Sequence, residues 1–124
     1  MVVMKEKRIS VVVPALEEAG GIVAMLERLA PLRACGHEVI LVDGGSQDGT
    51  VDVAGPLVDR VLTSTPGRAR QMNAAAAVAR GDVLWFLHAD TLAPPEAGAA
   101  IQAALLEGYR WGRFDVRLSG RAAI

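Results

Sequence analysis

The residues best suited to chemistry are acids that follow short apolar runs. Asp90 stands just beyond the apolar run 84–87, and Glu18 and Asp43 follow two earlier runs. Because open α/β sheets bind ligands at the carboxyl ends of parallel strands, we expect these acids to share one crevice. A carboxylate there can hold a hard divalent cation, and the cation can hold phosphates. Since no Gly-Lys phosphate loop accompanies the acids, the pattern favours a nucleotide-sugar site over an ATPase.

Basic groups and a histidine accompany these acids. Arg68 and Arg70 stand at the start of a predicted helix, where positive charge opposes the helix dipole. Either they bind a diphosphate, or they belong to a solvated charged face. His88 and Asp90 are two residues apart, so in an extended segment both face the same side. His88 is then either a ligand-facing hydrogen-bonding group or a structural residue, and Asp90 is the better ligand for an oxygen-preferring cation.

Other acids have both a structural and a ligand-binding interpretation. Glu17 and Glu18 fit the first turn of a helix, where the helix dipole favours acids. We favour this interpretation for Glu17, whereas Glu18 is also a candidate ligand contact. Asp43 either accepts a hydrogen bond from a nucleobase or ribose, or belongs to a plain acidic turn. The glycines at 44 and 45 allow unusual torsions and close approaches at this turn.

Composition narrows the class of protein. The chain of 124 residues fits one domain, residues 1–124, and its 52% hydrophobic but 4% aromatic content predicts a core of Ala, Val and Leu. A net charge of −1 argues against a nucleic-acid-binding domain. The single cysteine, Cys35, excludes an internal disulfide and a Cys-based zinc site. Because no apolar run approaches the roughly 20 residues that span a bilayer, we expect a cytoplasmic protein, with peripheral membrane contact left open.

Hydrophobic periodicity predicts strands alternating with helices. This order predicts an α/β fold with a mostly parallel sheet and helices on both faces, in which the strand before Asp90 is central. The last strand is predicted to be antiparallel at an edge. The predicted strands are 9–13, 39–42, 57–62, 83–87 and 111–118, and the predicted helices are 17–32, 50–55, 68–80 and 95–107.

The motifs at these strand ends resemble those of family 2 glycosyltransferases, which have the Rossmann-like, nucleotide-sugar-binding GT-A fold. Residues 11–18 resemble the opening strand and its Pro-x-x-Asn-Glu signature, with Glu17 in place of Asn. Residues 43–50 resemble the Asp-Gly-Ser-x-Asp-x-Thr signature, and residues 67–73 resemble the Gly-rich entry to the next helix. The resemblance covers residues 9–91, most of the chain.

The resemblance implies a donor site that uses a metal. Asp90 stands at the last position of the Asp-x-Asp motif and would bind Mg²⁺ or Mn²⁺, whereas His88 replaces the first Asp. This His-Ala-Asp version resembles one bacterial subgroup of the family. Pro14, Glu18 and Asp43 would line the nucleoside pocket. The expected donor-binding set is Pro14, Ala15, Glu18, Asp43, Gly45, Arg68, His88, Ala89 and Asp90.

The implied activity is transfer of a sugar from a nucleoside-diphosphate donor to a hydroxyl acceptor, with inversion. The family places its catalytic base after the donor half, so this chain is expected to be a donor-binding half that is truncated at its C-terminus, and Asp115 is not assigned as the base. Two alternatives stay open: a catalytically incomplete binding or assembly module, and a sugar nucleotidyltransferase. An exposed sheet edge would favour a homodimer.

Overall fold

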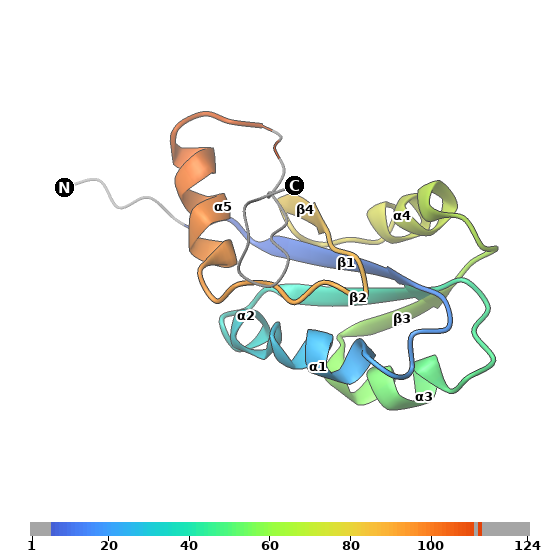
Figure 1. Ribbon diagram of the computed structural model, residues 1–124. Helices are drawn as coiled ribbons and strands as arrows, with labels where there is room; N and C mark the ends of the chain where they lie inside the picture. Colours follow the sequence, from blue (N-terminus) through green and yellow to red (C-terminus); the bar gives the residue numbers. More distant parts are fainter. Residues whose placement is uncertain (1–5, 111, 113–124) are drawn as a thin grey trace, which may run out of the picture.

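The computed structural model describes residues 6–110 and 112, which form a four-stranded sheet in the order β3-β2-β1-β4 (Figure 1). Each pair of neighbouring strands is parallel, which confirms the predicted sheet type. The strands are β1 (Ile9–Ala15), β2 (Glu38–Asp43), β3 (Arg60–Thr63) and β4 (Val83–Phe86).

Helices cover both faces of this sheet, as predicted. Figure 1 shows α1, α2 and α3 on one side, and α4 packs on the other side against β1, β2 and β3. Within the described ranges, no helix combines the length and the apolar character needed to cross a membrane. The helices are α1 (Ile22–Glu27), α2 (Ala30–Ala34), α3 (Thr50–Ala54), the 3-10 helix η1 (Gly55–Leu57), α4 (Arg68–Ala76) and α5 (Ala97–Leu106).

The two central strands are buried because both of their faces are covered. All six residues of β2 are buried, and in β1 only Pro14 is partly exposed. Such continuous apolar strands are typical of parallel sheets with helices on both sides. Alternate residues enter different cores: Val11 and Val13 face the side of α1, whereas Val12 faces the smaller cluster around Ala75 of α4.

The predicted helix 17–32 is wrong in its start and in its continuity. Residues 16–21 form a loop, α1 begins at Ile22, and a separate helix α2 begins at Ala30. Glu17 cannot start a helix because its φ is +54°, in the left-handed region. Pro31 lies in the first turn of α2, where its missing N–H costs nothing, so a new helix starts there.

Other element bounds, and the place of one strand in the sheet, also differ from the predictions. The chain from Gly55 forms a 3-10 turn, so the third strand is Arg60–Thr63 rather than 57–62. Helix α4 ends at Ala76 instead of residue 80. In the described part of the sheet, β4 pairs with β1 alone and is an outer strand, so the central position predicted for it is wrong. The predicted strand 111–118 lies outside the described residues.

A buried polar network joins the amino ends of the strands. The Glu38 carboxylate accepts hydrogen bonds from the Ser10 hydroxyl and the Arg80 N–H, both 2.5 Å long. Burial alone would raise the pKa of Glu38, but these bonds and the positive charge of Arg8 hold that pKa below its ordinary value. Glu38 is therefore a charged link between β1, β2 and the segment before β4.

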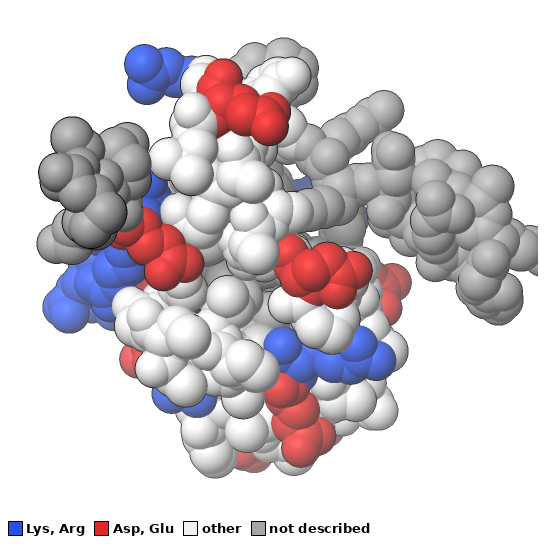
Figure 2. Space-filling view, turned by 90° about the vertical axis from the view of Figure 1, so that its left-hand side faces the viewer, with Lys and Arg blue, Asp and Glu red and all other residues white. Residues whose placement is uncertain are grey.

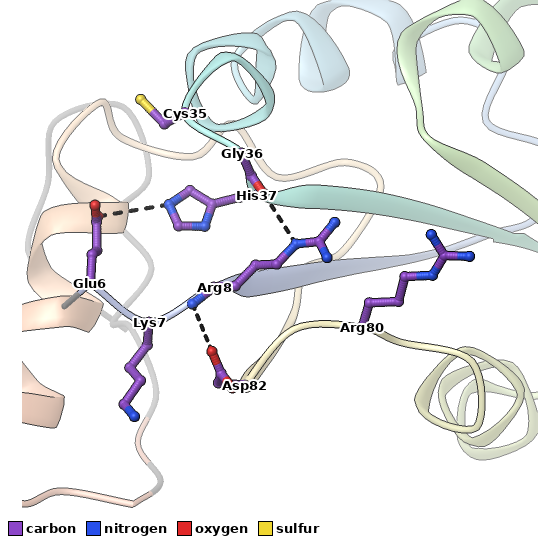
Figure 3. Close-up of a pocket in the computed structure, with 8 residues that line it drawn as sticks. All are labelled: Glu6, Lys7, Arg8, Cys35, Gly36, His37, Arg80 and Asp82. Atoms are coloured by element: carbon purple, nitrogen blue, oxygen red, sulfur yellow. Dashed lines mark hydrogen bonds and ion pairs between the residues drawn. The ribbon is translucent and has the colours of Figure 1, made fainter.

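The amino ends of the strands also border a cavity of about 440 Å³, which we call the amino-end cavity (Figure 3). Several of its polar groups are hydrogen-bonded to one another: Arg8 donates through Nε to the Gly36 carbonyl (3.1 Å) and through its backbone N–H to Asp82 (3.1 Å). His37 and Glu6 lie 3.8 Å apart. The face on the left of Figure 1 shows acidic and basic groups interspersed among uncharged residues (Figure 2).

Replacing Glu38 with Gln should lower the free energy of unfolding at pH 7 by about 1 kcal/mol, because hydrogen bonds to a carboxylate are stronger than those to a neutral amide. The folded-state pKa of Glu38 lies below the ordinary value of 4.5. Its contribution to stability is therefore complete above that value and is lost as the pH falls toward the folded-state pKa. Urea unfolding at pH 7 and at about pH 3.5 should show the difference between the two proteins shrinking in acid.

The exposed Glu107 at the end of α5 provides the control, since Glu107→Gln should change stability little at either pH. A Glu38→Gln deficit of the same size at both pH values would contradict a role for the carboxylate charge.

Candidate functional site

At the opposite end of the sheet, the loop after β1 is bound to the loop after β2. These loops lie at the right-hand end of the sheet in Figure 1. Three successive backbone N–H groups of the first loop donate to side-chain oxygens of the second. The bonds run from Glu17 to Ser46 Oγ (2.8 Å), from Glu18 to Thr50 Oγ1 (2.9 Å) and from Ala19 to Asp48 Oδ2 (3.1 Å).

Asp48 lies at the centre of this connection. Its carboxylate accepts hydrogen bonds from the hydroxyl and the N–H of Thr50 and from the N–H of Ala19. These bonds, that of the Thr50 hydroxyl above all, hold the pKa of Asp48 below its ordinary value. Asp48 also satisfies the first N–H of α3, although the N-cap residue of that helix is Gly49.

The Asp43 carboxylate turns toward its own loop. It accepts the N–H of Gly45 (3.0 Å) and both the N–H (2.7 Å) and the hydroxyl (2.5 Å) of Ser46, and only 2% of Asp43 is exposed. Gly45 has a φ of +106°, which the turn requires and which glycine adopts readily. Asp43 and Gly45 thus shape the loop and do not line the cavity described next.

A cavity of about 310 Å³ opens where the carboxyl ends of β1 and β4 meet the start of α4. We call it the carboxyl-end cavity. It brings together most of the residues that the sequence analysis selected. Its lining consists of Pro14, Ala15, Leu16, Glu18, Gly67, Arg68, Gln71, His88, Ala89 and Asp90.

The segment after β4 presents alternate side chains to this cavity. Leu87 N–H still pairs with the Val12 carbonyl (2.9 Å), so the chain remains alongside β1 beyond the last strand residue. Ala89 is 4% exposed and points into the core, whereas His88 and Asp90 on either side of it are exposed. Both line the cavity, although residues 88–91 form a turn, closed by the Thr91 N–H on the His88 carbonyl (3.0 Å), and not the extended segment that the spacing argument assumed.

Four side chains that can bind a charged ligand or take part in a reaction surround the cavity: two acids, one arginine and one histidine. Within residues 6–110 and 112, the side chains of Glu18, Arg68, His88 and Asp90 form no hydrogen bond or ion pair with another described residue. Asp43, in contrast, has its carboxylate occupied by its own loop.

The donor set of the cavity fits a hard divalent cation that shares its coordination with phosphates. The described residues contain no cluster of three or more His, Cys, Asp or Glu that could enclose a metal. Mg²⁺ and similar ions are commonly held by only one or two carboxylates together with substrate phosphates and water. Asp90 and Glu18 offer such oxygen ligands, and Asp90 lies on the same segment as His88.

Sequence reasoning missed Leu16, Gly67 and Gln71 as lining residues. Gln71 is 5% exposed although it is polar, and it lies one helical turn before the buried Ala75. Its position on the buried face of an alanine-rich helix was the available signal, because a glutamine there needs hydrogen-bond partners.

Comparison with known proteins agrees with this geometry. The sequence model described as glycosyl transferase family 2 matches residues 10–120, most of the chain. The chain belongs to this family.

Among similar curated proteins, the undecaprenyl-phosphate 4-deoxy-4-formamido-L-arabinose transferase of Aeromonas hydrophila is 32% identical over an alignment covering 83% of this chain and 35% of that protein. The protein of the same name from Pseudomonas savastanoi is 30% identical, with 83% and 34% covered. This family 2 chain therefore spans about a third of the length of these curated relatives.

Solved structures confirm the predicted GT-A fold class. Glucosyl-3-phosphoglycerate synthase from Mycobacterium tuberculosis, in complex with Mn²⁺, UDP and glucosyl-3-phosphoglycerate, has a TM-score of 0.72 and 28% identity, covering 82% of this chain and 40% of that chain. The mannosyltransferase PcManGT from Pyrobaculum calidifontis, in complex with GDP-Man and Mn²⁺, has a TM-score of 0.70 and 25% identity, covering 81% and 33%.

The backbone at Glu17 leads to a stability prediction. Asparagine tolerates the left-handed region better than glutamine does, so Glu17→Asn should be more stable than Glu17→Gln by about 0.5–1 kcal/mol. Both variants replace the charged carboxylate with a neutral carboxamide, and Gln alone retains the length that lets Oε1 of Glu17 reach the Gln47 N–H (2.6 Å). Urea unfolding of the two variants measures the difference, and a more stable Gln variant would show that this contact outweighs the φ of +54°.

Proposed function

We propose that this chain binds a nucleoside-diphosphate sugar in the carboxyl-end cavity and that the protein transfers the sugar to a hydroxyl acceptor with inversion. The observation that carries the proposal is the convergence of Glu18, Arg68, His88 and Asp90 on one cavity. A diphosphate needs positive charge, and a cation that bridges to it needs carboxylate oxygen. The same cavity supplies both kinds of group from three separate segments.

Asp90 would hold Mg²⁺ or Mn²⁺, with Glu18 as the second oxygen group within the lining. When bound, a divalent cation neutralises charge on the diphosphate leaving group. The M. tuberculosis and P. calidifontis neighbours were both solved with Mn²⁺, and this supports the use of a metal here. His88 supplies a ring N–H or nitrogen lone pair for hydrogen bonding to the donor rather than a second carboxylate.

Arg68 would bind the diphosphate from the opposite wall. It is the first residue of α4 and is exposed, so its guanidinium can reach phosphate oxygens without losing another partner. The N-terminus of α4 adds partial positive charge beside it. This role explains why an arginine stands where the helix dipole disfavours positive charge.

The nucleoside would lie against the end of β1, where Pro14 and Ala15 line the cavity. For Asp43 and Gly45 we propose a supporting part in the same donor site: they fix the loop after β2, which in turn fixes the backbone at Glu18. Asp43 would thus influence donor binding indirectly, by fixing the conformation of the loop after β2. We assign no catalytic base, since Glu18 and Asp90 are the only carboxylates of the described lining.

A second candidate is a chain that binds the donor without transferring the sugar. It is favoured by the described lining of the carboxyl-end cavity, in which Glu18 and Asp90 are the only carboxylates and neither is assigned as a base. Sugar release from UDP- and GDP-sugars in the presence of an acceptor panel would distinguish the two candidates, because a donor-binding module would leave the donor intact.

Asp90→Asn should abolish the gain in nucleotide affinity that Mn²⁺ provides, a loss of about tenfold or more, since an amide is a far weaker ligand for a hard cation. Calorimetric titration of UDP and GDP with and without Mn²⁺ measures this gain. Asp52→Asn, an exposed change on α3, is the matched control. Equal affinities of Asp90→Asn and the unmodified protein in Mn²⁺ would refute the role of Asp90.

His88→Asp should raise affinity for Mn²⁺ by about tenfold, because it adds a second oxygen ligand on the segment that carries Asp90. The control is Leu92→Asp, which adds the same charge at an exposed position that does not line the cavity. Manganese titration of both variants without nucleotide tests this expectation, and equal gains in both would indicate a general charge effect instead of coordination.

A further inference from the structure

Gln71 connects three segments beneath the carboxyl-end cavity. Its Nε2 group donates to the carbonyls of Ala15 at the end of β1 (3.1 Å) and Val42 near the end of β2 (2.9 Å). Its Oε1 accepts the N–H of Gly67 (3.3 Å), just before α4. Both amide hydrogens are therefore used, and the buried carboxamide fastens the start of α4 to the two strands.

The loop after β2 leaves room for this carboxamide. A Cβ atom at Gly44 would lie 3.3 Å from Nε2 and 3.4 Å from Oε1 of Gln71, which is tighter than ordinary contact. Gly44 also donates its N–H to the Ala15 carbonyl (2.9 Å), so that oxygen receives one bond from the loop and one from Gln71. Glycine is needed at position 44 so that the Gln71 carboxamide can approach the backbone, whereas at position 45 it is needed for the positive φ.

Gln71 also fixes the residue that precedes Arg68. Gly67 donates its N–H to Oε1 of Gln71, and its carbonyl accepts the Gln71 backbone N–H (2.9 Å). Both polar groups of this peptide segment are thus held by one residue, although glycine alone would be free to rotate. Because Arg68 follows directly, the direction in which its side chain leaves the backbone is set by this pair of bonds.

We propose that Gln71 is a positioning residue that holds Arg68 and the end of β1 in the geometry needed to bind a diphosphate. The proposal rests on the function proposed above and adds a residue that acts from beneath the cavity. Its buried carboxamide orders the Gly67–Arg68 segment before the ligand arrives, so Arg68 loses less freedom when it binds.

The test is a double-mutant cycle with UDP and Mn²⁺ as the probe. Gln71→Met keeps the length of the side chain and removes all three bonds, and it should weaken UDP binding by about tenfold. Arg68→Ala should then cost much less affinity in the Gln71→Met protein than in the unmodified protein, because Arg68 is no longer held in place. Additive losses, or no loss in Gln71→Met, would overturn the proposal.

The matched control is Gln102→Met. Gln102 also bonds to backbone through both ends of its carboxamide, with Lys7 O (2.6 Å) and Lys7 N (3.0 Å), but it lies on α5 away from the cavity. It should leave UDP affinity unchanged. Should Gln71→Met fail to fold by circular dichroism, Gly44→Ala displaces the carboxamide without deleting it and should weaken UDP binding in the same direction.

A measurement made without ligand tests the positioning role of Gln71 independently of the proposed donor binding. The Gly67 amide proton should exchange faster with solvent in Gln71→Met, as measured by nuclear magnetic resonance, whereas amides in β2 stay protected. If the unmodified protein does not bind UDP with Mn²⁺, the proposed function fails, and the Gly67 amide still decides the local claim. Unchanged exchange at Gly67 would overturn it.

Discussion

The main constraint on this structure comes from the backbone N–H groups between β1 and α1, which must find hydrogen-bond partners outside both elements. The N–H groups of residues 17–19 have no partners within β1 or α1, and that of Glu18, which is half-buried, needs one. Side chains of the next loop supply them, since Ser46, Asp48 and Thr50 each accept one bond. The wall of the carboxyl-end cavity on the β1 side therefore depends on residues that do not touch the cavity.

The two ends of the sheet use polar groups in different ways. At the amino ends, the Glu38 carboxylate accepts hydrogen bonds from Ser10 and from the Arg80 N–H, so its charge helps to join neighbouring strands. At the carboxyl ends, the joining is done by Asp43, Asp48 and Gln71, which leaves the side chains that surround the cavity available for a ligand. This division is typical of α/β proteins, in which one edge of the sheet serves stability and the other serves binding.

Much of the fold was predictable from the sequence, because the buried strands are continuous apolar runs and each is followed by turn residues. The start of the helix at 17–32 was mispredicted because acids such as Glu17 and Glu18 are typical of a first helical turn, whereas here the conformation of their loop is set by hydrogen bonds to residues distant in sequence. The convergence of Glu18 and Asp90 followed from parallel strand ends, whereas spacing alone could not show that the Asp43 carboxylate faces its own loop. Gln71 was missed because a polar residue near a helix start resembles a solvated one, although its place one turn before Ala75 on an alanine-rich helix was a signal that it is buried.

The contact at Gly81 has a consequence for evolution of the segment that contains β4 and Asp90. A Cβ there would come within 2.6 Å of the Ser10 backbone nitrogen and 2.9 Å of the Arg8 carbonyl, so β4 enters the sheet flush against β1. A slip of β4 by one residue would invert its pleat, so that the buried Trp85 would become exposed and the exposed Leu84 and Phe86 would be buried. Insertions or deletions between residues 81 and 90 should therefore be rarer among descendants of this sequence than substitutions of the exposed residues within that stretch.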